Sequence, residues 1–325
     1  MRNVLSPKEV ALAIGVSESS LKRWADAGRI RVRRTAGGHR RIAIQEAIRF
    51  ARENGFPVVR PDLLDLPEAG RTPGASVELA SLNEALYELL NAGEAEEVRA
   101  VLLELYLAGR PLSEVFDGPM RTAMERIGQE WRHGEAGIYV EHRATDICIQ
   151  AVTMVRGLIS GDGNADAETE RNRPIALGGA PAHDPYVLPS LMAATVLADL
   201  GYREVNLGPE TPTRAMIAAA RHYRPQLIWL SCSVVDAVPP TGDLEGLAST
   251  VREWGGDILV GGRGFDDKRP LRVEGIKFVP TMAMLAHAAE ETARPWARKP
   301  RVKAARADVT DDARAGAVLD IEIID

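Results

Sequence analysis

The spacing of apolar residues changes along the chain and divides it into three parts. Residues 77–160 carry apolar side chains three and four positions apart, which is typical of amphipathic helices. In residues 173–297, short apolar runs alternate with helix-period segments, which is typical of a parallel sheet with interleaved helices. Residues 1–60 combine two short helix patterns with an arginine-rich hairpin pattern. We therefore expect a multidomain chain of α and α/β parts.

The third part is centred on the stretch from Gly178 to Pro212, which has the pattern of a strand end, a Gly/Pro-rich loop, a helix and a strand. Repetition of this unit predicts a doubly wound, Rossmann-like or flavodoxin-like domain with a five-stranded parallel sheet. Ligands of such sheets bind at the carboxyl ends of the strands, so we expect loop 178–188 and turn 208–212 to line one pocket. The strands are expected at 174–177, 204–207, 227–231, 258–260 and 277–279, and the helices at 188–200, 212–222, 243–254 and 281–294.

Four helical segments with short connections predict a four-helix bundle over residues 77–160. They are expected at 77–92, 94–109, 112–132 and 138–159. The Pro- and Gly-rich residues 61–76 and the polar residues 161–172 are predicted to be linkers. The tail 298–325 changes from basic to acidic and is predicted to be mostly disordered, although its last residues, VLDIEIID, leave an edge strand or a partner contact open.

The first part has the pattern of a helix-turn-helix. Ser6 is the expected N-cap of the first helix, which Gly15 ends, and Ser17 is the expected N-cap of the second. The second helix of such a unit enters the major groove of DNA. Its polar residues, which we expect to face DNA, are Ser19, Ser20, Lys22 and Arg23. The next segment, 29–41, alternates apolar residues with arginines around a Gly-Gly pair, which predicts a two-stranded wing.

Charge is distributed unevenly between the parts. Residues 1–60 hold 13 Lys and Arg against 5 Asp and Glu, a net charge of +8, whereas the remaining residues hold 27 against 41, a net charge of −14. A basic module fused to an acidic body is typical of a nucleic-acid-binding protein with a regulatory domain. On charge alone, a solvated basic face remains an alternative.

The composition limits the classes of function. No apolar run reaches about 18 residues and the N-terminus has no targeting signal, so we expect a soluble, cytoplasmic protein without membrane contact. Cys148 and Cys232 lie in apolar segments, which argues against a disulfide framework or a thiolate metal site. No nucleophile–base pair or cluster of metal ligands stands out, and we expect a protein that is not an enzyme.

Two motifs of the first part, LKRW at 21–24 and RTAGGHRR at 34–41, resemble the recognition helix and the wing of the MerR family of transcriptional regulators. The resemblance covers residues 4–50 and implies a winged helix-turn-helix that binds a double-stranded DNA operator. Base contacts are then expected from Ser19, Ser20 and Lys22. Phosphate contacts are expected from Arg33, Arg34, His39, Arg40 and Arg41.

The order of the parts, together with several motifs, resembles the light-dependent repressors of the CarH and LitR type and, more distantly, the corrinoid module of methionine synthase. The resemblance covers about residues 4–295 and implies adenosylcobalamin held between the bundle and the sheet. The motifs LGPETP, SCSVV and VGGRG then mark the corrin edge and the nucleotide tail, with Gly208, Ser231, Ser233, Gly261 and Gly262 as cofactor-binding residues. The bundle residues matched to the cover of the adenosyl group are Trp131, Ile138, Glu141 and His142.

One motif departs from that resemblance. The acidic-x-His-x-x-Gly motif, whose His ligates cobalt in the family, falls on residues 184–189, where Asp184 is kept, Tyr186 replaces the His and Pro189 replaces the Gly. Deprotonating a phenol with a pKa near 10 costs about 4 kcal/mol at pH 7, so a tyrosine is a poor substitute. His183 could replace the family's His only if the loop were reshaped.

Three hypotheses follow for the function. In the first, a repressor binds adenosylcobalamin base-on, or with Tyr186 or His183 near the lower face of the cobalt, and light changes the oligomeric state of a homo-oligomer and its DNA affinity. In the second, the DNA-binding module is kept, while the pocket takes haem, a bilin or a partner protein and light plays no part. In the third, the chain is the corrinoid carrier of an enzyme, which the DNA-binding pattern disfavours.

Overall fold

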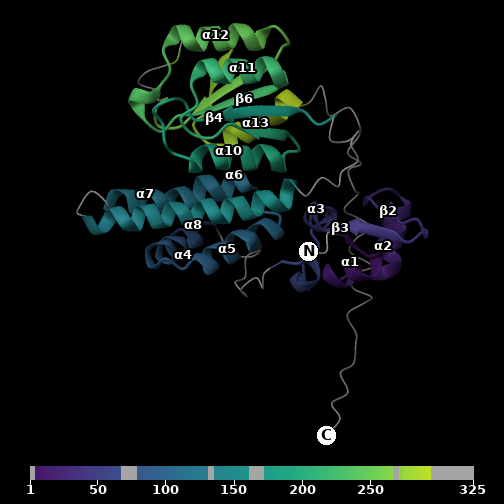
Figure 1. Cartoon of the computed structure of the whole chain (residues 1–325). Helices are drawn as coiled ribbons and strands as arrows, with labels where there is room; N and C mark the ends of the chain where they lie inside the picture. Colours follow the sequence, from purple (N-terminus) through teal and green to yellow (C-terminus); the bar gives the residue numbers. More distant parts are fainter. Residues whose placement is uncertain are drawn as a thin grey trace. The chain divides into compact units, whose positions relative to one another are not determined.

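The structure is a computed structural model that describes residues 4–66, 79–130, 135–160, 172–265, 271 and 273–293. The chain divides into two compact units, one within residues 1–65 and one within residues 66–296 (Figure 1). The predicted tail 298–325 lies outside the described residues, as does Trp131. Within the described residues, no helix combines the length and the apolar character that crossing a bilayer requires.

The first unit is a small α/β module with a three-stranded antiparallel sheet in the order β1-β3-β2. Ser6 and Glu9 form a capping box at the start of α1, and the Ser17 side chain caps α2, as the sequence predicted. The helix α3 after the wing and the short strand before α1 were not predicted. The elements are β1 (Val4–Leu5), α1 (Pro7–Ala13), α2 (Glu18–Asp26), β2 (Arg33–Arg34), β3 (Arg40–Ala43), α3 (Ile44–Asn54) and the 3-10 helix η1 (Pro61–Leu64).

The first residues of the predicted linker 61–76 belong to this module. Residues 61–64 form η1, which packs against α1, and Leu64 and Leu66 are buried. Pro61 is well suited to the first position of this helix because its missing N–H would be unpaired there. A linker can therefore start only after Leu66, and the rest of the predicted linker lies outside the described residues.

The second unit begins with the helical bundle. The third predicted helix is continuous in space but contains a π-helical turn at Pro119, where the missing N–H and the ring of proline disfavour regular α-helical bonding. The bundle consists of α4 (Leu79–Ala92), α5 (Ala95–Leu107), α6 (Leu112–Val115), the π-turn η2 (Phe116–Met120), α7 (Arg121–Glu130) and α8 (Glu135–Ser160).

The sheet of the second unit has five parallel strands in the order β5-β4-β6-β7-β8. This confirms the predicted doubly wound, flavodoxin-like fold, with strand and helix ends within two residues of those expected. Helices α11 and α12 cover one face, and α10 and α13 cover the other (Figure 1). The strands are β4 (Ile175–Gly179), β5 (Arg203–Asn206), β6 (Leu227–Ser231), β7 (Asp257–Gly261) and β8 (Ile276–Phe278); the helices are α10 (Leu188–Asp199), α11 (Thr213–Tyr223), the 3-10 helix η4 (Val235–Ala237), α12 (Thr241–Arg252) and α13 (Met282–Ala293).

The bundle packs on the α10 and α13 face of the sheet. Helix α8 lies along α10, and the Arg156 guanidinium donates to the Glu204 carboxylate at the start of β5, with 2.8 Å between Nε and Oε1. In the π-turn, both carboxylate oxygens of Asp117 accept backbone N–H groups of the first turn of α13, from Met282 and Ala283, each at 2.8 Å. A bundle side chain therefore caps a helix of the sheet domain.

Replacing Asp117 with alanine is expected to loosen this junction. Two N–H groups of α13 lose their partner, which should lower the free energy of unfolding by about 1–2 kcal/mol. Urea unfolding of the full chain measures the loss. Glu114→Ala, an exposed acidic residue of α6, is the matched control and should change stability by less than about 0.5 kcal/mol. Equal losses in the two variants would contradict the assigned cap.

Candidate functional site

The second helix of the first unit presents the polar face that the sequence predicted. Leu21 is buried, whereas Ser19, Lys22 and Arg23 are exposed. Ser20 is half-buried, and its backbone N–H donates to the Ser17 Oγ at 3.1 Å. On the opposite side, Trp24 packs against Phe50 of α3 and against Phe56, with ring centroids 5.4 and 5.2 Å away. The helix is thus anchored on one side and open on the other.

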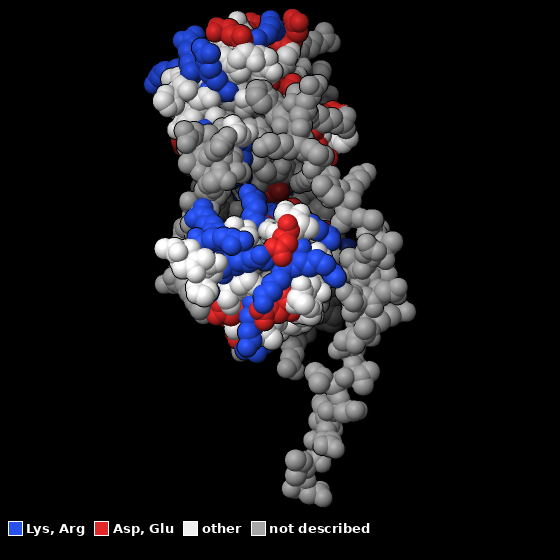
Figure 2. Space-filling model, turned by 90° about the vertical axis from the view of Figure 1, so that its right-hand side faces the viewer, with Lys and Arg blue, Asp and Glu red and all other residues white. Residues whose placement is uncertain are grey.

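The predicted wing is the hairpin β2–β3. Its register pairs Arg33 with Arg41 and Arg34 with Arg40. Gly38 in the turn has φ +77°, which a side chain would strain. Three wing residues are exposed, namely Arg33, Arg34 and His39, whereas Arg40 and Arg41 are half-buried. Figure 2 shows Lys and Arg side chains gathered on one face of this unit.

Arg40 differs from the other wing arginines because it contacts α2. It forms an ion pair with Asp26 and donates to the Lys22 carbonyl at 3.4 Å. Only 24% of its side chain is exposed. In this structure Arg40 therefore fixes the wing against the helix, and its contact with phosphate stays a prediction.

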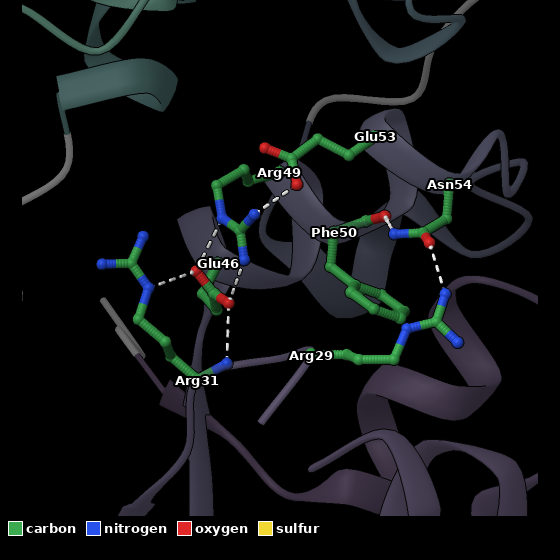
Figure 3. Close-up of polar contacts among 7 residues, drawn as sticks. All are labelled: Arg29, Arg31, Glu46, Arg49, Phe50, Glu53 and Asn54. Atoms are coloured by element: carbon green, nitrogen blue, oxygen red, sulfur yellow. Dashed lines mark hydrogen bonds and ion pairs between the residues drawn. The ribbon is translucent and has the colours of Figure 1, made fainter. Parts of the chain in front are cut away.

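A buried glutamate that the sequence analysis missed holds the start of the wing (Figure 3). Glu46 of α3 is 8% exposed, and its carboxylate accepts the Arg31 backbone N–H at 2.7 Å and the Arg31 Nε at 3.1 Å. It also accepts the Arg49 Nε at 2.9 Å. Burial by itself would lower the pKa of Arg49, but the hydrogen bonds and charges of Glu46 and Glu53 outweigh it and raise that pKa. These groups form a charge-balanced cluster that joins the wing to α3.

The second candidate site lies at the carboxyl edge of the five-stranded sheet. Asp184, in the loop after β4, is fully buried, and its carboxylate accepts the backbone N–H groups of Tyr186, at 3.1 Å, and Ser233. The Asp184 carbonyl accepts the Glu210 N–H at 3.1 Å, and the Glu210 carboxylate accepts the His183 N–H at 2.7 Å. The loops after β4, β5 and β6 therefore meet at Asp184, and the two loops expected to line one pocket are adjacent.

Exposed apolar side chains gather around this edge. Within the described part of the second unit, the exposed large apolar residues lie in loops after strands or in first helical turns, and they are Ile138, Tyr139, Tyr186, Val187, Val235 and Met284. Helix α8 starts toward this carboxyl edge and ends at the amino edge of the sheet. Near its end, Arg156 pairs with Glu204 at the amino end of β5. Ile138 lies 18 residues before Arg156, a rise of about 27 Å. Figure 1 shows the first turns of α8 extending toward the carboxyl edge.

The remaining bundle residues of the predicted set lie near those turns. Glu141 is half-buried and accepts a hydrogen bond from Thr145 at 3.2 Å. His142 is 75% exposed, with its Nε2 3.7 Å from the Glu141 Oε2. The structure therefore places Ile138, Glu141 and His142 on neighbouring turns of α8, while Trp131 lies outside the described residues.

The predicted cofactor-binding glycines have different surroundings. Gly208, with φ +82°, has open space around the position of a Cβ atom. A Cβ on Gly261 would lie 2.5 Å from the Val279 carbonyl oxygen, and one on Gly262 would lie 2.3 Å from the Cys232 carbonyl oxygen. The neighbouring Ser231 is buried and Ser233 is half-buried. Gly261 and Gly262 are thus required by close approach of the chain itself, whereas of these three glycines Gly208 alone has open space beside its backbone.

Both cysteines are buried, Cys148 in α8 and Cys232 directly after β6. Burial, with a smaller contribution from the Asp184 carboxylate, raises the pKa of Cys232 to about 12, and burial raises that of Cys148 to about 12. Both are therefore neutral thiols near pH 7. Among the described residues, no three His, Cys, Asp or Glu side chains are grouped to hold a metal ion.

Two segments of the chain, one in each unit, match known domain families. Residues 4–54 match a helix-turn-helix domain family, and residues 82–156, which form most of the bundle, match a B12 binding domain family. No curated protein matches the chain. The chain therefore combines a helix-turn-helix domain with a helical domain of the B12-binding type.

Similar solved structures are distant corrinoid proteins. The monomethylamine corrinoid protein of Methanosarcina barkeri is 15% identical, with a TM-score of 0.47, over 65% of this chain and 98% of that one. The methanol:cobalamin methyltransferase complex MtaBC of the same organism is 14% identical, with a TM-score of 0.35, over 74% and 90%. A cobalamin-binding protein of Desulfitobacterium hafniense is 15% identical, with a TM-score of 0.35, over 66% and 98%.

Glu46→Ala is expected to release the wing from α3. The variant leaves the Arg49 guanidinium, which is 33% exposed, and the Arg31 N–H without their main acceptor, which should cost about 2–4 kcal/mol. Glu53→Ala removes a 48% exposed partner of the same arginine and should cost less than about 1 kcal/mol. Hydrogen exchange of peptides covering residues 29–54 measures both. The assignment fails if the two variants exchange alike.

Proposed function

We propose that the chain is a DNA-binding transcriptional regulator whose second unit senses a cobalamin-type ligand. The observation that carries the proposal is the presence, in one chain, of a helix-turn-helix domain and a B12-binding-type bundle packed on a parallel sheet with an apolar carboxyl edge. A regulator of this kind needs no catalytic group, and we propose that the protein is not an enzyme.

The DNA-binding half is supported by the distribution of free positive charge. Several cations of the first unit are neutralised by carboxylates: Lys22 by Glu18, Arg40 by Asp26, and Arg31 and Arg49 by the Glu46 cluster. The cations Arg34 and Arg41 remain on the wing, next to the exposed polar face of α2. With α2 in the major groove, the wing would follow the phosphates of the adjacent strand. The resemblance to the CarH- and LitR-type repressors makes repression the expected effect.

The ligand-binding half is supported by the apolar edge. A corrin ring has apolar faces and a polar rim, and the exposed residues of α8 and of the loops after β4 and β6 offer apolar surface for such a ring. Gly208 leaves open space at the same edge, while Glu141 and His142 offer polar groups on α8. These residues fit a corrinoid held by its ring, and they do not fit one ligated by a histidine at position 186. When bound, adenosylcobalamin would supply a photolabile cobalt–carbon bond.

The proposed regulation is a linkage between ligand binding in the second unit and DNA binding by the first. A ligand that contacts both α8 and the sheet favours one arrangement of bundle and sheet by the difference in its affinity for the two arrangements. If that arrangement changes the oligomeric state, the number of wings that contact DNA together changes, and avidity changes with it. Light sensitivity and oligomer exchange are proposed from the CarH-type resemblance.

A second candidate keeps the DNA-binding half and changes the ligand. Tyr186, at the position of the family's cobalt ligand, is 43% exposed at the carboxyl edge. A tyrosine oxygen is a known ligand of haem iron. Haem, a bilin or a partner protein is therefore the alternative occupant, with no light response.

Arg34→Ala is expected to weaken binding to every duplex by a similar factor. Loss of one phosphate contact should reduce the slope of log K against log salt concentration by roughly 0.9. Fluorescence anisotropy at several salt concentrations measures both quantities. Arg214→Ala, an exposed arginine of α11, removes the same charge from the other unit and should leave the slope unchanged. Equal slopes in both variants would refute the proposed wing contact.

Ile138→Glu is expected to weaken ligand binding at the carboxyl edge by about tenfold or more, because burying an isoleucine contributes about 2 kcal/mol. The protein is incubated with adenosylcobalamin in the dark, passed through gel filtration, and its visible spectrum is recorded before and after green light. Leu12→Glu, an exposed leucine of the other unit, is the control and should retain the ligand. The same procedure is repeated with haem and the unchanged protein. Retention of haem but not of adenosylcobalamin by that protein would favour the second candidate.

A further inference from the structure

One large indole, that of Trp229, lies between α10 and the middle of the sheet, within a cluster of buried apolar side chains. Trp229 of β6 is 2% exposed, and a Cβ atom on Gly178 of the adjacent β4 would lie 2.1 Å from its ring. Glycine is therefore the residue that this register allows opposite Trp229. A group that entered between α10 and these two strands would have to displace the indole.

Hydrogen bonds hold that indole in place. The Trp229 Nε1 donates to the Ser190 Oγ in the first turn of α10 at 3.1 Å, and the Ser190 hydroxyl donates to the Asn206 Oδ1 at 3.1 Å. The same Asn206 oxygen accepts the Gly208 N–H at 3.0 Å. This chain of bonds joins β6, α10, β5 and the turn at Gly208, so moving the indole would leave buried polar groups unpaired.

In the loop after β4, the position of the family's histidine holds a tyrosine, which has no side-chain nitrogen. The buried Asp184 carboxylate is engaged by the N–H groups of Tyr186 and Ser233, which fixes the loop. His183 has φ +68°, and its backbone is held by Glu210 on the other side of that anchor. Tyr186 carries a phenol, whose oxygen is the only heteroatom of that side chain.

Cobalamin, in contrast, carries a dimethylbenzimidazole base that can occupy the lower position of its own cobalt. We propose that cobalamin binds at this edge with that base still on the cobalt, and that no protein nitrogen replaces it. Trp229 occupies the space between α10 and the sheet, which a displaced base would need, and residue 186 of the Asp184-anchored loop is a tyrosine. This inference rests on the proposed function and specifies the form in which the ligand is bound.

The test is electron paramagnetic resonance of cob(II)alamin bound to the full chain labelled uniformly with nitrogen-15. A base that stays on the cobalt contributes natural nitrogen-14 and splits each cobalt line into a triplet. A histidine of the protein would contribute nitrogen-15 and give a doublet. We expect the triplet; a doublet, or no nitrogen splitting, would overturn the inference while leaving cobalamin binding intact. Failure to retain cob(II)alamin would instead overturn the proposed function together with the inference.

Two variants test the role of the indole separately. Tyr186→His alone should still give the triplet, because Trp229 leaves no place for a displaced base. Tyr186→His combined with Trp229→Ala should give the doublet, provided that circular dichroism shows native helix content. A doublet from Tyr186→His alone would show that Trp229 is not the obstacle. If the double variant does not fold, the wild-type spectrum alone decides the inference.

Discussion

The buried carboxylate of Asp184 is the group on which the carboxyl edge of the sensor unit depends. Burying a carboxyl group is costly unless hydrogen bonds replace those that it makes with water, and here backbone N–H groups of two different loops supply them. The same residue's carbonyl holds the turn that contains Glu210. Because three loops converge on one residue, the shape of the edge is fixed before any ligand arrives. A preformed edge with exposed apolar side chains is suited to a large, flat ligand.

The two units use charge in different ways. In the first unit, the Glu46 cluster and the Arg40–Asp26 pair cancel positive charge at the start of the wing and on its second strand, so that the proposed phosphate contacts fall to other wing cations such as Arg34. In the second unit, the Arg156–Glu204 pair and the Asp117 cap join the bundle to the sheet. The Arg156–Glu204 pair lies at the amino edge of the sheet, and the Asp117 cap lies beside the carboxyl edge. A ligand at the carboxyl edge would therefore act on an interface that polar contacts already hold together.

The sequence predicted the parts of the fold whose signal is local. Buried parallel strands such as β6 are continuous apolar runs, and Ser6 and Ser17 mark the starts of helices, so these elements were expected almost where they lie. The cap on α13 by Asp117 joins residues 165 positions apart, and the fit of Trp229 over Gly178 depends on strand register. The spacing of apolar residues along the sequence carries no information about such long-range contacts. Glu46 was missed for the same reason, since a buried glutamate in a helix has the same pattern as an exposed one.

The central claim is that a cobalamin-type ligand and DNA are linked through one chain. The direct measurement is the affinity for a DNA duplex, selected by the protein from a random pool, with and without saturating adenosylcobalamin in the dark. Ligand affinity is then measured with and without that duplex. We expect a change of about fivefold or more in DNA affinity and, by reciprocity, the same factor in ligand affinity. Identical DNA affinities with a demonstrably bound ligand would contradict it.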